Sequence, residues 1–282
     1  MNLDHNYVWP DGKKAAAVIS IDFDGPSPYL WATRDSDASA MGELELRRFG
    51  PRQGIFRLLK LFEDLDLRIS AYVPGAVAIA ERNTLAALLS SGHEVAMHGY
   101  MHEKVTQLGG DQLMVVLEKS AKALEAAGVE APFGYRSPSW ELTVEALGAL
   151  GEFGVDYDSS LMGYDHPYWM SNLVEVPVQW PLDDAIFYRY VPGSNWPPVT
   201  PSEVVAGWKL ELDGAKRYGS LFMLTMHPWL SGRAGRMLAL AELLEEYRDD
   251  DEIWWTTAKE VAQYHRLTYG AEPHESPRLG EI

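Results

Sequence analysis

Two histidines stand four residues apart, His98 and His102, directly after a short apolar run that is typical of a buried strand. Two aspartates, Asp22 and Asp24, stand where another apolar run ends. A set of two histidines and one aspartate commonly holds a zinc-like divalent ion and leaves positions open for water and substrate. The pattern therefore predicts a metal site. The alternative is that the histidines are polar turn residues and that the aspartates form a turn before a Gly-Pro pair.

Further polar residues follow other apolar runs and could complete an active site. Asp22 and Asp24 would face the same way on a strand and repel each other unless a cation neutralises them. We expect a metal ion on Asp24 and an arginine, Arg136, beside Asp22; a surface salt bridge is the other interpretation of Arg136. His227 is expected to be a proton donor or a histidine satisfied at the edge of the core. Asp158 would orient His227 or cap the next segment.

Apolar runs alternate with segments of helical spacing along most of the chain, and every candidate residue above follows a run. This alternation predicts one barrel-like α/β domain, in which active sites lie at the carboxyl ends of the strands. The expected domain spans 1–270, and an extended or disordered tail spans 271–282. Strands are expected at 15–21, 67–73, 93–97, 133–138, 155–160, 172–178, 220–226 and 253–255. Helices are expected at 53–66, 84–91, 112–127, 143–151, 203–218, 235–247 and 257–265, and a long loop at 28–50.

Composition narrows the class of protein. The chain has 282 residues, of which 46% are hydrophobic and 23% charged, as in ordinary soluble globular proteins. A net charge of −17 argues against binding to nucleic acid or to an anionic membrane surface. There is no cysteine, no signal-peptide pattern and no apolar stretch long enough to span a membrane. We therefore expect a cytoplasmic protein that acts on a small molecule or a sugar.

Aromatic side chains gather between 163 and 201, where regular periodicity is weak. They include Tyr164, Trp180 and Trp196. A segment of this length and kind is usually a functional cover or an interface. We expect Tyr100, Trp140 and Trp180 to line the substrate pocket.

Five ordered motifs between residues 14 and 265 resemble those of the polysaccharide deacetylase family. They are Asp22-Phe-Asp24, His98-Gly-Tyr-Met-His102, Arg136-Ser-Pro138, Tyr157-Asp158-Ser and Leu224-Thr-Met-His227. The resemblance implies a distorted barrel of about seven parallel strands and a zinc-type ion held by Asp24, His98 and His102. It also implies that Asp22 is the general base, that Arg136 orients it, and that His227 and Asp158 form the general-acid pair.

One motif departs from the common family pattern, because Phe23 separates two aspartates that are usually adjacent. This spacing resembles a cytoplasmic branch that includes peptidoglycan-deacetylase-like proteins, cyclic imide hydrolases and allantoinase-like relatives, and it implies a homo-oligomer. We expect metal-dependent removal of an acetyl group from an N-acetylated sugar or polysaccharide such as peptidoglycan, with a backbone N–H near Gly99 or Tyr100 helping to stabilise the oxyanion. Alternatives are ring opening of a cyclic imide or ureide and, in another class, a non-catalytic carbohydrate-binding protein.

Overall fold

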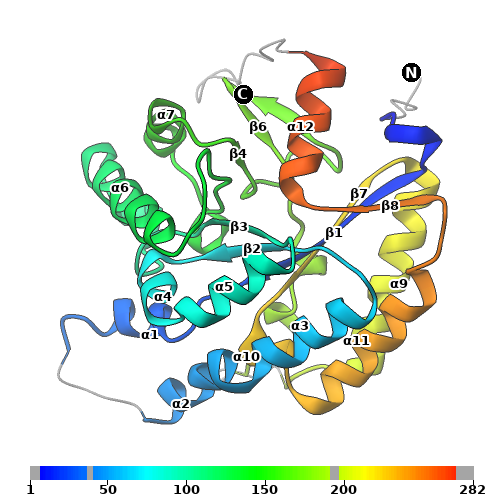
Figure 1. The fold of residues 1–282 in the computed structure, drawn as a ribbon, viewed down its shortest axis with the longest axis horizontal. Helices are drawn as coiled ribbons and strands as arrows, with labels where there is room; N and C mark the ends of the chain where they lie inside the picture. Colours follow the sequence, from blue (N-terminus) through cyan, green and yellow to red (C-terminus); the bar gives the residue numbers. More distant parts are fainter. Residues whose placement is uncertain (1–6, 37–40, 191–196, 271–282) are drawn as a thin grey trace.

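A parallel β-sheet runs through the centre of the molecule in the computed structural model (Figure 1). The structure describes residues 7–36, 41–190 and 197–270, so Trp196 and the tail expected at 271–282 lie outside the described residues. The central strand order is β3-β2-β1-β7, and β8 pairs with the first half of β1. The strands are β1 Ala15–Asp22, β2 Ser70–Val73, β3 Glu94–Met97, β4 Tyr157–Asp158, β5 Tyr168–Met170, β6 Leu173–Glu175, β7 Leu221–Met226 and β8 Ile253–Thr256.

Single-residue bridges extend this sheet on both sides, as a barrel requires. Tyr135 bridges Met97 at the end of β3 and Asp158 in β4, and β4 continues in parallel to β6. On the opposite side, Asp183 bridges Thr225 of β7. The pairings are parallel apart from β5 with β6. The α/β class is therefore confirmed, although the strand expected at 133–138 is reduced to the bridge at Tyr135.

Helices surround the sheet and follow most of the predicted segments. They are α1 Ser27–Ala32, α2 Met41–Phe49, α3 Ile55–Asp64, α4 Gly75–Ala80, α5 Arg82–Ser90, α6 Gly110–Ala126, α7 Val144–Phe153, α8 Ala185–Tyr188, α9 Pro201–Tyr218, α10 Pro228–Ser231, α11 Ala234–Tyr247 and α12 Ala258–Tyr269. The prediction of a long loop at 28–50 was wrong, because this stretch contains most of α1 and all of α2. An i,i+4 ion pair between Glu43 and Arg47, 2.8 Å apart, supports α2 and was not recognised in the sequence.

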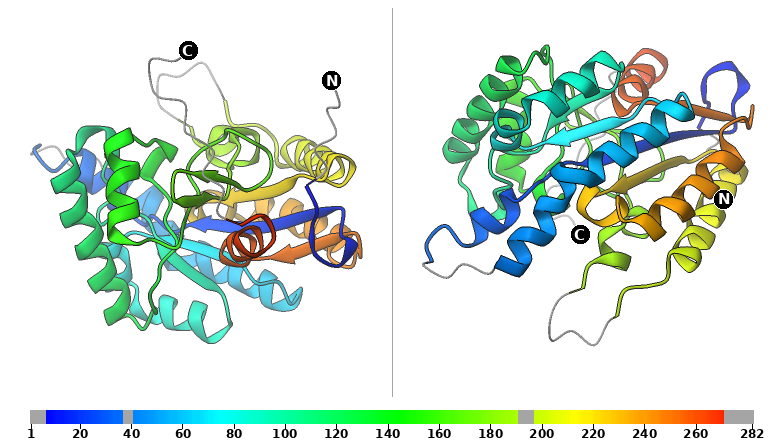
Figure 2. Two further views of the ribbon diagram at one scale, coloured as in Figure 1. Left: turned by 90° about the horizontal axis from the view of Figure 1, so that it is seen from above. Right: turned by 60° about the horizontal axis from the view of Figure 1, so that its bottom comes forward.

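The two faces of β1 belong to two different parts of the core, which is why its whole length is buried. Ile19 and Ile21 pack into the cluster that includes residues of α3 and α11, whereas Val18 packs into a second cluster with Val261 of α12. Helices α3 and α11 lie side by side along one side of the sheet, and α12 lies on the other side (Figures 1 and 2). A strand covered on both faces is typical of a parallel α/β sheet.

Candidate metal centre and active site

The carboxyl ends of three strands of the central sheet, β1, β3 and β7, deliver the candidate side chains to one edge of the sheet. Asp22 is the last residue of β1, His98 follows β3, and His227 follows β7. The strands are parallel and in register, with Ile21 opposite Met226, so their carboxyl ends coincide. Residues far apart in the sequence therefore meet at this edge.

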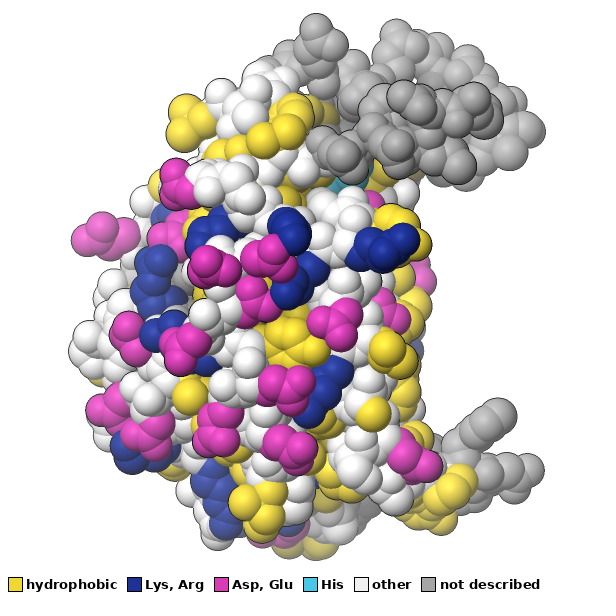
Figure 3. Space-filling model, turned by 90° about the vertical axis from the view of Figure 1, so that its right-hand side faces the viewer, with side chains coloured by type: hydrophobic (Ala, Val, Ile, Leu, Met, Phe, Trp, Pro, Cys, Tyr) yellow, Lys and Arg dark blue, Asp and Glu magenta, His cyan; other side chains and the backbone are white. Residues whose placement is uncertain are grey.

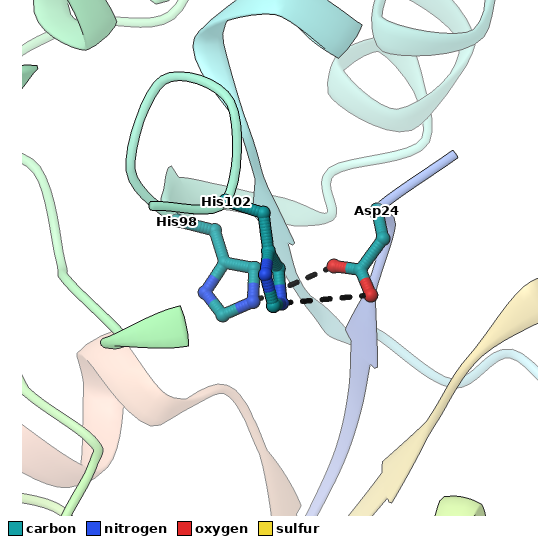
Figure 4. A group of neighbouring side chains, drawn as sticks. All are labelled: Asp24, His98 and His102. Carbon is teal, nitrogen blue, oxygen red and sulfur yellow. Dashed lines mark ion pairs between the residues drawn. The ribbon is translucent and has the colours of Figure 1, made fainter. Parts of the chain in front are cut away.

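Asp24, His98 and His102 come together as the sequence predicted (Figure 4). Nε2 of His98 lies 3.5 Å from Oδ1 of Asp24, and Nε2 of His102 lies 3.8 Å from Oδ2 of the same carboxylate. One ligand atom from each of the three residues lies within 4.8 Å of the others. The side chains of Asp24 and His98 are almost completely buried, and 15% of the His102 side chain is exposed.

A tight turn between the two histidines sets their spacing. Gly99 and His102 both have positive φ, +68° and +63°. Both oxygens of the buried Glu103 carboxylate accept a backbone N–H bond, from Tyr100 and from Met101, each at 2.9 Å. A Cβ on Gly99 would lie 2.9 Å from Glu103, so a side chain cannot be added there without moving the turn. Glu103 is thus a positioning residue for which no role was predicted from the sequence, and the Tyr100 N–H proposed for the oxyanion is already occupied.

The protonation states of the two histidines suit a divalent ion. Nδ1 of His98 donates to the carbonyl oxygen of Arg136 at 2.8 Å, which leaves Nε2 as an acceptor on the side of Asp24. Burial lowers the pKa of His98, and burial with the nearby charge of Arg47 lowers the pKa of His102 to about 3, so both rings are neutral. Oδ1 of Asp24 is buried and has no hydrogen-bond partner among the described residues. An orphaned carboxylate oxygen beside two neutral imidazoles fits a metal ligand set.

Arg136 lies against Asp22, as predicted. Its Nη1 donates to Oδ1 of Asp22 at 2.8 Å and to Ser20 at 2.9 Å, while Nε and Nη2 donate to the carbonyl and hydroxyl oxygens of Ser159, both at 3.0 Å. Burial would raise the pKa of Asp22, but the charge of Arg136, with a smaller contribution from His227, lowers it to about 2. Asp22 is therefore ionised at neutral pH, and its charge is balanced by a buried, fixed guanidinium.

His227 is held by Asp184, not by Asp158. Its Nδ1 lies 2.7 Å from Oδ1 of Asp184, and its backbone N–H donates to Oδ2 of the same residue at 3.0 Å. Burial lowers the pKa of His227, but Asp184 and Asp183 outweigh burial and raise it to about 10, so the imidazole is protonated at neutral pH. Asp183, Asp184 and His227 are also near enough to hold a metal ion. Since the Asp184 oxygens already accept from His227 and Ser231, they are less available to a metal ion than the orphaned Oδ1 of Asp24.

The expected pairing of Asp158 with His227 was wrong, because Asp158 contacts other groups. Its Oδ1 accepts from Ser160 at 2.7 Å, and it neighbours the buried carboxyl of Glu175, which accepts the backbone N–H groups of Ser160 and Leu161. Burial raises the pKa of both carboxyls, and their proximity raises that of Glu175 further. The consecutive aspartates 183 and 184 were the missed signal, since they stand in the irregular aromatic segment.

A cavity of about 820 Å³ opens over these groups. Its lining includes the rings of Trp140 and Trp180, which stack with centroids 4.7 Å apart, as well as Trp31 and Trp229. Trp140 and Trp180 thus lie where the sequence predicted. Tyr100 does not line the cavity: its ring packs against Gly75 and lies under Lys119.

His93 lies away from this site. It stands before β3, at the amino end of that strand, and lines a separate cavity of about 450 Å³ with Arg68. A structural role fits this position.

Comparisons with known proteins agree with the fold. The family model for polysaccharide deacetylases matches residues 49–157. A polypeptide from Mycobacterium smegmatis that is classed as a polysaccharide deacetylase is 35% identical, with a TM-score of 0.88 over 96% of both chains. The chain therefore belongs to the polysaccharide deacetylase family and is an enzyme of that family.

Two other proteins are also similar to this chain, one in sequence and one in fold. The peptidoglycan deacetylase of Helicobacter pylori is 28% identical over 89% of this chain and 96% of its own length. The allantoinase PuuE, at 20% identity, has a TM-score of 0.82 over 94% of both chains, which is a likeness of fold.

Within the described ranges, none of the helices combines the length and the apolar composition needed to cross a membrane.

Proposed function

We propose that the protein removes the acetyl group from an N-acetylated sugar or sugar polymer, with a divalent ion, preferably zinc, held by Asp24, His98 and His102. The observation that supports this proposal is that three kinds of chemical group lie around one cavity. These are a ligand set with an orphaned carboxylate oxygen, an ionised Asp22 and a protonated His227. Peptidoglycan is the preferred polymer because the peptidoglycan deacetylase of H. pylori matches over nearly its whole length.

Each residue has a role that follows from its contacts. When bound, the ion would lower the pKa of water and polarise the acetyl carbonyl. Asp22, kept ionised by Arg136, accepts the proton of the attacking water. His227 lines the cavity and donates its proton to the departing nitrogen, while Asp184 fixes the ring through Nδ1.

Acetate release from an N-acetylglucosamine tetramer tests this proposal. Zinc-loaded protein should release acetate, chelated protein should not, and re-addition of zinc should restore release. The matched control is the Asp22→Asn variant, which keeps the ligand set. Chelator-independent release would contradict the metal assignment, and turnover of any kind would exclude a purely carbohydrate-binding protein.

Ring opening of a small cyclic imide or ureide is a second candidate. It is favoured by the size of the cavity, since about 820 Å³ walled by stacked Trp140 and Trp180 is typical of a site for a compact ligand. Loss of the ring chromophore of a cyclic imide, without acetate release from the tetramer, would select this candidate.

The homo-oligomeric state and the cytoplasmic location that were expected from the sequence stay predictions.

A further inference from the structure

Three cationic side chains surround the opening of the active-site cavity, and each comes from a different segment. Arg34 follows α1, Lys104 lies between β3 and α6, and Arg189 follows α8. All three line the cavity and are exposed, so they form its mouth. The acidic side chains of the same cavity lie at its floor or are already paired: Asp22, Asp24 and Asp183 are buried, and Glu43 pairs with Arg47.

Among the described residues, few acidic side chains form ion pairs with the cations of this mouth. Neither Lys104 nor Arg189 has a described carboxylate oxygen within 4.0 Å of its side-chain nitrogens. Arg34 has one contact of 3.5 Å with Asp35, whose side chain is 85% exposed, and such a pair contributes little. The guanidinium of Arg34 is instead fixed over the ring of Trp31, 3.9 Å from its centroid, and Nη1 donates to the Trp31 carbonyl oxygen at 2.7 Å.

Another face of the molecule has a different charge pattern. Where α9 and α11 face outward, basic and acidic side chains are interspersed (Figure 3). Lys209 pairs there with Glu246 at 2.5 Å, and Lys216 pairs with Asp250 at 2.6 Å. In a chain with a net charge of −17, a mouth with one weakly paired cation and two cations that pair with no described carboxylate is a local cluster of exposed positive charge. Such a cluster attracts anions to the opening of the cavity over the catalytic groups.

We propose that this mouth recognises a carboxylate on the substrate, so that the preferred substrate is an N-acylated sugar carrying an acidic group elsewhere on the same molecule. The inference rests on the proposed deacetylase function and adds the charge of the substrate to it. Trp31 and Trp180, which both line the cavity, offer flat apolar surfaces for the sugar, while Arg34, Lys104 and Arg189 attract the acid. A neutral sugar oligomer would use the aromatic surfaces alone.

A matched pair of substrates tests this inference. The acid is the disaccharide of N-acetylglucosamine and N-acetylmuramic acid, and the control is its methyl ester, which lacks the negative charge and adds one methyl group. With the wild-type protein, kcat/KM for the acid should exceed that for the ester by about tenfold at low salt, and added salt should reduce the difference. In the double variant Lys104→Met/Arg189→Met, kcat/KM for the acid should fall by about tenfold and that for the ester by less than about twofold.

A charge-matched control separates the mouth from net charge. Lys122→Met removes a cation from α6, where 76% of the side chain is exposed and which does not line the cavity, and it should leave the preference for the acid unchanged. Equal kcat/KM for acid and ester, or an equal loss for both in the double variant, would overturn the inference.

Binding distinguishes failure of the inference from failure of the proposed function. If neither disaccharide releases acetate, the deacetylase proposal fails for these sugars. The recognition of the carboxylate can then still be tested by binding. Metal-replete protein is titrated calorimetrically with the acid and with the ester, and the two affinities are compared. Tighter binding of the acid that is lost in the double variant would support it, and equal or undetectable binding of both would overturn it.

Discussion

Asp184 binds both the side chain and the backbone of His227. One carboxylate oxygen lies 2.7 Å from Nδ1 of the imidazole, and the other accepts the backbone N–H at 3.0 Å. Two contacts from one carboxylate fix the rotation of the ring as well as its charge. Nε2 therefore remains available for proton donation to a substrate in the cavity.

Replacement of Asp184 should impair proton donation more than replacement of Asp158. The Asp184→Asn variant removes the charge that favours the protonated imidazole, so we expect kcat to fall by about 100-fold with metal content unchanged. Asp158→Asn should reduce kcat by less than about tenfold, because Asp158 contacts Ser160 rather than His227. Steady-state acetate release and metal analysis check both variants. Equal losses of kcat would contradict the assignment of Asp184.

His98→Ala should remove bound metal and turnover together. The variant deletes a ligand atom and the Nδ1 contact with the Arg136 carbonyl oxygen, so kcat should fall by at least about 100-fold. His93→Ala provides the matched control, since this histidine lines a different cavity and should retain its metal. Elemental analysis of the purified variants gives the readout. Full metal content in His98→Ala would exclude His98 as a ligand.

Asp22→Asn should retain metal but lose turnover. Loss of the proton acceptor is expected to lower kcat by about 10²–10⁴-fold. The same change leaves the Arg136 guanidinium, which is fully buried, without its counter-charge, and this should cost about 3–5 kcal/mol of stability. Metal analysis, acetate release and guanidinium chloride unfolding separate the two effects. Metal loss in a folded Asp22→Asn variant would contradict the division of roles between Asp22 and Asp24.

The buried pair of Asp158 and Glu175 should tolerate an amide better than an apolar residue. Burial and mutual proximity raise the pKa of Glu175 well above its usual range, so we expect the pair to share one proton. In Glu175→Gln, the amide can still accept from Ser160 and Leu161 and can donate to Asp158, so stability should be nearly unchanged. Glu175→Leu leaves two buried N–H donors unpaired, at about 1–3 kcal/mol each. Equal destabilisation of both variants would argue against a shared proton.

Stability should decline in mild acid because of His265. This ring is 5% exposed, and Nδ1 lies 2.9 Å from the hydroxyl of Tyr7. Burial, together with the neighbouring His166 and Arg266 side chains, lowers the pKa of His265 to about 4, below the value of about 6.5 in the unfolded chain. Between these values the unfolded state binds a proton that the folded state does not, so the stabilisation is present above pH 6.5 and is lost as the pH falls towards 4.

The His265→Gln variant checks this assignment. Its free energy of unfolding, measured by denaturant titration at several pH values, should vary less between pH 4 and 6.5 than that of the wild-type protein. Unchanged pH dependence would assign the acid sensitivity to other groups.

The sequence alone determined the parts of the site that depend on local patterns. Apolar runs mark buried strands, and parallel strands end at one edge, so the meeting of Asp24, His98 and His102 follows from the order of residues. The contact between Arg136 and Asp22 follows from the need to balance a second buried carboxylate.

Only the tertiary structure decided which carboxylate holds His227. Asp184 precedes it by 43 residues, in a segment of weak periodicity, and reaches it because Asp183 pairs with β7 at Thr225. The stacking of Trp140 on Trp180 and the position of Arg189 at the cavity mouth likewise bring together segments that no local pattern connects. Periodicity reports which face of an element is buried, whereas the partner of an irregular segment depends on the packing of the whole chain.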